Sequence, residues 1–111
     1  MGYINIEQLI EAAPDVISRG TLGDIKTSFG LAKHWAENCV LGKMVDSLLF
    51  VGQGIDDVVD EMAYAFKKGK IESEDYDAYI SKLEEFQWGT VPRMVKDILP
   101  ERCSCKLRKE E

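Results

Sequence analysis

Four side chains of this chain are soft metal ligands, which is the number that zinc usually takes. They are the single histidine, His34, and three cysteines, Cys39, Cys103 and Cys105. His34 and Cys39 are five residues apart, so on a helix they point about 140° away from each other. Cys103 and Cys105 form a C-x-C pair between basic residues, which favour the thiolate. We predict no zinc centre, and we keep a thiol or metal-handling role of the C-x-C pair as an alternative.

A second group of ligands is the acidic sequence Asp56-Asp57-Val58-Val59-Asp60. On a helix, Asp56 and Asp60 share one face and offer oxygen ligands to a hard cation. This DDxxD pattern resembles the aspartate-rich motif with which prenyl-diphosphate synthases hold magnesium and diphosphate. That family needs a larger bundle and a second acidic motif, and this chain has neither. We therefore interpret the carboxylates as a solvated acidic helix face and predict no metal site.

Residues 21–43 resemble a helix-turn-helix DNA-binding element, with the turn expected at Gly30. The resemblance implies that Lys33, His34 and Glu37 face the major groove and that Lys26, Lys33 and His34 form a positive DNA-binding patch. The second helix of this element has few basic or hydrogen-bonding side chains. The formal net charge of −6 also disfavours general attraction to a phosphate backbone. A helix-turn-helix transcriptional regulator is therefore an alternative function.

Enzymatic chemistry finds no recognisable motif in the sequence. His34 has no nucleophile in a familiar spacing, and no glycine-rich phosphate loop follows a strand. A di-iron bundle needs Glu-x-x-His on two helices, and one histidine cannot supply both. We predict a protein that is not an enzyme and that has no cofactor.

The elements that must position these residues are predicted to be helices. Between Leu48 and Phe66, apolar side chains recur every third or fourth residue, which is typical of an amphipathic helix. The predicted buried stripe consists of Leu48, Ile55, Val59, Met62 and Phe66, with Val51 or Gly52 filling the gap after Leu48. Glycine costs about 1 kcal/mol against alanine in a helix interior, so a break at Gly52–Gly54 is favoured over one helix with a close crossing point.

Caps and breakers divide the rest of the chain into further helices. Asn5 and Gln8 have the spacing of a capping box, and Lys67-Lys68-Gly69 is a typical helix end. The other expected boundaries are caps at Thr21 and Ser73, an end at Gly89, and an end at Pro100. Strand-like alternation is absent. We predict an all-α bundle of four to five helices in one domain, residues 1–100, followed by a mobile tail, residues 101–111.

Composition is consistent with a small acidic globular protein. The chain has 111 residues, 45% of them hydrophobic, and an odd number of cysteines, three. Together with the lack of a signal peptide, this indicates the reducing cytoplasm. The central apolar run, Leu48 to Val51, is far shorter than the ~20 residues of a membrane span, so no membrane association is expected.

Large aromatic side chains suggest how such a bundle works. The chain has more rings than a small core needs, and exposed aromatic residues are typical of binding hot spots. We expect Trp35, Tyr64 and Trp88 to take part in contacts. The segment 66–83 also resembles the helical hairpin of short oligomerisation modules. The function predicted is protein–protein interaction, as a homodimer or as a subunit of an assembly.

Overall fold

The computed structural model describes the backbone of residues 3–109 and the side chains of residues 3–100. The described backbone is helical and contains no strand, so the predicted all-α fold is confirmed. Its elements are α1 (Ile6–Glu11), α2 (Arg19–Glu37), α3 (Leu41–Lys67), α4 (Ser73–Glu85), the π-helical segment η1 (Phe86–Thr90) and α5 (Val91–Lys109).

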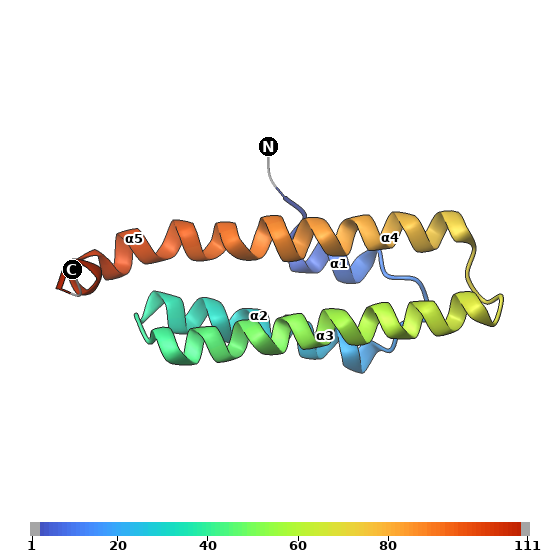
Figure 1. Cartoon of the computed structure of the whole chain (residues 1–111), viewed down its shortest axis with the longest axis horizontal. Helices are drawn as coiled ribbons and strands as arrows, with labels where there is room; N and C mark the ends of the chain where they lie inside the picture. Colours follow the sequence, from blue (N-terminus) through green and yellow to red (C-terminus); the bar gives the residue numbers. More distant parts are fainter. Residues whose placement is uncertain (1–2, 110–111) are drawn as a thin grey trace.

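The helices form an elongated bundle with extents of 54 × 27 × 21 Å. Helices α2 and α3 make an antiparallel hairpin, and α4, η1 and α5 follow one another as a single long rod along it (Figure 1). The short helix α1 packs beside this rod near its middle. Four helices lie together only where α1 is present, whereas α3 and α4 alone continue to the turn that joins them (Figure 1).

The core lies where the hairpin, the rod and α1 meet. Its buried side chains are Ile6, Leu9, Ile17, Leu22, Ile25, Val51, Ile55, Val58, Met62, Tyr79, Leu83 and Phe86. The rings of Phe29 and Phe86 pack with centroids 5.1 Å apart and tie α2 to η1. Two residues differ from the predicted α3 stripe: Phe66 is exposed, and Val58 is fully buried. Val51, one of the two residues expected to fill the gap of the stripe, is also buried.

Helix α3 is unbroken at Gly52–Gly54, so the favoured break is wrong. Gly54 is buried where α3 crosses α2, and a Cβ placed on it would lie 2.5 Å from Cγ1 of Ile25. The glycine thus allows two helix backbones to approach, which offsets its low helix propensity. Val51 and Val58, three residues before and four residues after Gly54, lie on the same buried side of α3.

Two predicted helix ends are confirmed in detail. The side chain of Asn5 accepts a bond from the Gln8 N–H at 2.8 Å, and the Gln8 side chain accepts one from the Asn5 N–H at 3.0 Å. Gly69 has φ of 73°, and the Lys70 N–H donates to the Ala65 carbonyl at 2.8 Å. This is the Schellman arrangement that glycine favours.

Other boundaries differ from the sequence-based expectation. Helix α2 begins earlier than predicted, with Ser18 as its N-cap, and Thr21 lies inside its first turn. Glu72, not Ser73, is the N-cap of α4, and neither Ser18 nor Glu72 caps through its own side chain. At Ser18 the acceptor comes from α3: Glu61 accepts bonds from the Ser18 N–H and the Thr21 hydroxyl, each at 2.7 Å.

The rod also continues through both of its predicted ends. Gly89 is buried within η1, because the ring of Tyr3 occupies the space that a Cβ would need. Pro100 lies inside α5, which continues to Lys109, so the predicted end at Pro100 is wrong. The tail predicted at residues 101–111 is thus helical as far as Lys109. Its side chains lie outside the described part, and its mobility stays a prediction.

Candidate protein interaction surface

The first half of α3 carries more apolar side chains than the core uses. Six of the eight residues from 44 to 51 are apolar. Met44 and Val51 are buried, but Val45, Leu49 and Phe50 are 48%, 68% and 60% exposed. These side chains are exposed because only α2 and the rod pack against this half of α3. They cover one side of the helix, and the other side faces solvent.

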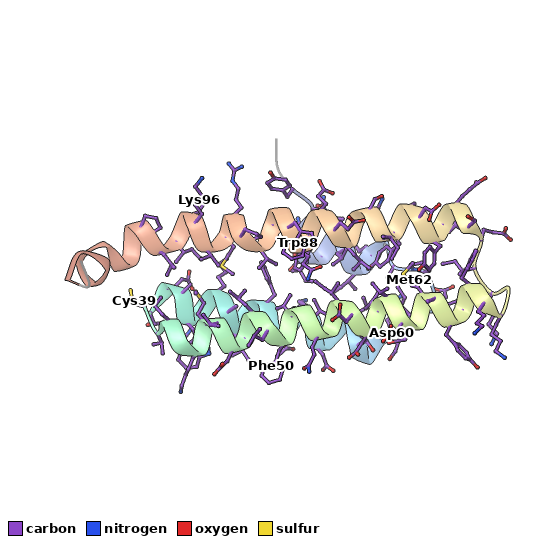
Figure 2. The ribbon with its side chains drawn as sticks, in the orientation of Figure 1. Cys39, Phe50, Asp60, Met62, Trp88 and Lys96 are labelled. Carbon is purple, nitrogen blue, oxygen red and sulfur yellow. The ribbon has the colours of Figure 1, made fainter. Side chains whose placement is uncertain are left out.

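Trp88 extends this apolar surface across to the rod. It lies in η1, next to the buried Gly89, and is 71% exposed. Figure 2 shows Trp88 at the edge of the rod nearest α3, and Phe50 on the outer side of α3. An exposed tryptophan costs hydrophobic free energy that burial would recover, about 25 cal/mol for each Å² of apolar area.

A groove separates α3 from η1 and α5 beside Trp88. It has a volume of about 450 Å³, and its lining is almost wholly apolar, from Leu48, Val51, Gly52, Gln87, Trp88, Val91, Pro92, Val95 and the stem of Lys96. A second hollow of about 780 Å³ adjoins it along α3 and shares Leu48, Gly52 and Gln87 with it. The two hollows together are lined by Leu48, Leu49, Gly52, Trp88, Val91 and Val95. We call this surface, with the exposed Val45 one helical turn before Leu49, the contact face.

Charged residues border the contact face with opposite signs on its two sides. Asp46 and Asp56 line the α3 side, and Lys96 lines the α5 side. Asp56 is exposed, and Lys96 extends into solvent (Figure 2). An apolar centre with a charged rim is the usual anatomy of a protein interface.

The three aromatic residues predicted for contacts do not converge on one surface. Trp35 is half-buried near the α2–α3 turn, with Lys43 Nζ 4.7 Å from its ring centre. Tyr64 is 62% exposed near the other end of α3, about 32 Å from Lys43 at 1.5 Å per helical residue. Only Trp88 belongs to the contact face.

The helix-turn-helix geometry is absent. Residues 19–37 form the single helix α2, which passes through Gly30 without a turn, so the predicted turn there is wrong. The chain reverses instead at Asn38–Val40, between two long antiparallel helices. Lys26, Lys33 and His34 are exposed along α2 rather than presented by a separate recognition helix.

The residues considered as metal ligands in the sequence do not form a metal site among the described residues. Asp56 and Asp60 are exposed on α3, and no group of three or more His, Cys, Asp or Glu side chains comes together among the described residues. Cys39 is disulfide-bonded and has φ of 60°, a left-handed conformation that is uncommon outside glycine. Cys39 is half-buried and is not a free thiol in this structure. The side chains of Cys103 and Cys105 lie outside the described part.

Sequence reasoning predicted Trp88 as a contact residue but missed the α3 side of the contact face. The signal was the run from Met44 to Val51, in which apolar side chains occupy more than half of the helix circumference. A helix packed on one side needs a narrower stripe. The excess pointed to a second covered side, on which Val45 and Leu49 lie.

In comparisons with known proteins, no family model, no curated protein and no solved structure matches the chain. Among the residues that the structure describes, no helix is both long enough and apolar enough to cross a bilayer.

Proposed function

We propose that this chain is a non-enzymatic helical protein that acts through protein–protein contact, and that the contact face is its binding surface. The observation that carries the proposal is the exposure of Trp88, 71%, in the apolar groove and of Leu49, 68%, in the hollow that adjoins it. Contiguous exposed apolar patches with a polar rim mark interaction sites in soluble proteins. Tryptophan is one of the residue types enriched at binding hot spots.

DNA binding through Lys26, Lys33 and His34 is the alternative function. It depended on a helix-turn-helix with its turn at Gly30, and α2 has no turn there. Retention of the chain on immobilised DNA at low salt, lost as salt rises, would revive it.

The cytoplasmic location stays a prediction, and the disulfide at Cys39 weighs against it. Thiols are kept reduced in the cytosol, whereas disulfides persist in oxidising compartments. Alkylation of the freshly isolated chain before and after reduction distinguishes the two. A chain that holds all three cysteines as thiols at isolation supports the cytoplasm.

The experiment that tests the binding surface is site-specific photo-crosslinking in the cells that make the protein. A photoreactive amino acid replaces Leu49 in one variant and Leu31 in another. Leu31 is a matched control, because it is 45% exposed but lies on α2, outside the contact face. We expect position 49 to yield one reproducible product, with the partner chain and its crosslinked residue identified by mass spectrometry. Absence of a product at 49, or equal products at 31, would refute the proposal.

A further inference from the structure

We infer that the contact face binds an amphipathic helix of another protein, with basic residues beside the apolar stripe of that helix. The inference rests on the proposed function and names the chemistry of the partner at that same surface. Its grounds are the two helical walls of the groove, the length of the hollow along α3, and the sign of the charges that line it.

The contact face lies between two long helical walls. Helix α3 forms one wall, and η1 with α5 forms the other, running alongside it (Figure 1). Apolar side chains line both walls, Leu48 and Val51 on α3 and Val91 and Val95 on α5. A helix laid along such a groove buries its apolar stripe against both walls at once. Recognition by strand addition needs an exposed sheet edge, and the described part of the chain contains no strand.

The hollow along α3 has the length of a short partner helix. It extends from Asp46 to Asp56, which is about 15 Å at 1.5 Å per residue, or nearly three helical turns. Gly52 lies between these two residues and lines both hollows. A Cβ on Gly52 would meet no atom within 4 Å, so the surface is open there. This leaves space for one large apolar side chain of the partner next to Trp88.

The charges that α3 presents beside the face are all negative. Residues 44–66 include five acidic residues and no basic residue. Asp46 and Asp56 line the hollow itself. Asp60 is exposed four residues after Asp56, and therefore lies on the same side of the helix. Interfaces pair opposite potentials, so this side of the groove selects a partner with Lys or Arg along its α3-facing edge.

Three cations of neighbouring segments leave this negative charge in place. Lys43 Nζ lies 4.7 Å from the centre of the Trp35 ring, toward α2. Arg93 pairs with Asp97 along α5, with Nε and Oδ2 3.9 Å apart. Lys96 lines the groove with its stem, but its side chain points away from α3 (Figure 2). None of the three forms an ion pair with a carboxylate of the hollow.

The first test uses Trp88 as a fluorescent reporter in the full chain. Trp35→Phe removes the other of its two tryptophans. The probes are a helical peptide of about 15 residues with a leucine stripe flanked by lysine, and the same peptide with glutamate for lysine. We expect the lysine peptide to shift the Trp88 emission to the blue, with a dissociation constant at least roughly tenfold below that of the glutamate peptide. Equal binding of the two peptides, or binding of neither, would overturn the inference.

The second test separates the hollow from the general acidity of the chain. Asp46→Asn combined with Asp56→Asn should raise the dissociation constant of the lysine peptide by roughly tenfold. The control combines Asp24→Asn with Asp77→Asn, which removes the same charge from exposed positions on α2 and α4. The control should change binding by less than about twofold, because salt screens charges at a distance. Equal effects of the two double variants would show general attraction and overturn the inference.

The third test concerns the apolar contact. Leu49→Ala should raise the dissociation constant of the lysine peptide by roughly tenfold, as truncation of a contact in the centre of an interface does. Leu31→Ala is the control, because Leu31 is 45% exposed on α2. It should leave binding unchanged. Wild-type binding by both variants would place the peptide elsewhere on the chain.

The proposed function is judged separately by the crosslink at position 49. A crosslinked partner segment with an apolar helical stripe and flanking Lys or Arg supports both. An acidic or extended segment there, or a second copy of this chain, supports the contact face and overturns the basic helix. No product at all overturns both.

Discussion

Gly54 of α3 lies directly against Ile25 of α2, at a point where a single methyl group would not fit. The distance from a Cβ on Gly54 to Cγ1 of Ile25 would be 2.5 Å, well inside van der Waals contact. Both residues are buried, and Ile25 belongs to the main core. The crossing of α2 and α3 is therefore determined by the absence of one side chain.

The first prediction follows from this contact. Gly54→Ala should destabilise the chain by about 1–3 kcal/mol, because overpacking forces the helices apart or Ile25 out of its rotamer. The free energy of urea unfolding measures the effect. Gly30→Ala, at a helical glycine with open space, should instead stabilise by about 1 kcal/mol. If both alanines stabilised, the close crossing of α2 and α3 would be wrong.

A second prediction concerns the start of α2, which is capped from another helix. Glu61 of α3 accepts bonds from the Ser18 N–H and the Thr21 hydroxyl, the part that a glutamate three residues after the N-cap plays in a capping box. Glu61→Ala should therefore cost about 1–2 kcal/mol of stability, as the loss of a cap does.

The control for the Glu61 cap is the neighbouring acid Asp57, which is exposed on the same helix. Asp57→Ala should change the free energy of unfolding by less than about 0.5 kcal/mol, as surface substitutions usually do. Equal losses in the two variants would mean that Glu61 acts through general charge rather than through the cap.

A third prediction concerns the buried hydroxyl of Tyr79. It donates a 2.6 Å hydrogen bond to the Leu9 carbonyl, at the end of α1 where helix carbonyls lack intrahelical partners. Tyr79→Phe leaves that carbonyl unpaired and should cost about 1–3 kcal/mol near neutral pH. Tyr64→Phe, at an exposed ring, should have little effect.

Tyr79 also predicts how stability depends on pH. Burial raises the pKa of Tyr79 from 10.0 to about 12, so the folded chain holds this proton more tightly than the unfolded chain does. The stabilising contribution is complete below pH 10 and is lost as the pH rises toward 12. Subtracting the unfolding free energies of Tyr79→Phe from those of the wild type should reveal this decline. A difference that stays constant from pH 9 to 12 would contradict it.

A fourth prediction concerns Cys39, which occupies the helix-end position where Gly69 stands in α3. Both residues have positive φ, 60° and 73°. Under reducing conditions, Cys39→Gly should be more stable than Cys39→Ala by about 1–2 kcal/mol, because only glycine adopts this conformation without strain. Thermal unfolding of the two variants measures the difference, and equal stabilities would place Cys39 outside the left-handed region.

Local signals in the sequence were sufficient for much of the fold. The capping box at Asn5 and the end at Gly69 depend on neighbouring residues only, and both were predicted correctly. The all-α class followed from the apolar periodicity, which also reports a local property.

The errors lie where a distant residue decides. From the sequence alone, Gly54 and Gly89 were interpreted as a helix break and a helix end. In the structure, each glycine makes room for a side chain distant in sequence, Ile25 at Gly54 and Tyr3 at Gly89. The cap of α2 comes from Glu61, 43 residues beyond the Ser18 N–H that it accepts. The α3 side of the contact face was missed for the same reason: Leu49 is apolar, but only the packed helices show that it is left uncovered.

The central claim is that a protein covers the contact face when the chain functions. Hydroxyl-radical footprinting tests it by comparing the labelling of Trp88 and Tyr64 in the cell with that in dilute purified protein. Both rings are well exposed in the isolated chain, 71% and 62%, but Tyr64 lies away from the contact face. The account predicts that labelling of Trp88 falls severalfold in the cell while that of Tyr64 is unchanged. Equal labelling of Trp88 in the two settings would contradict it.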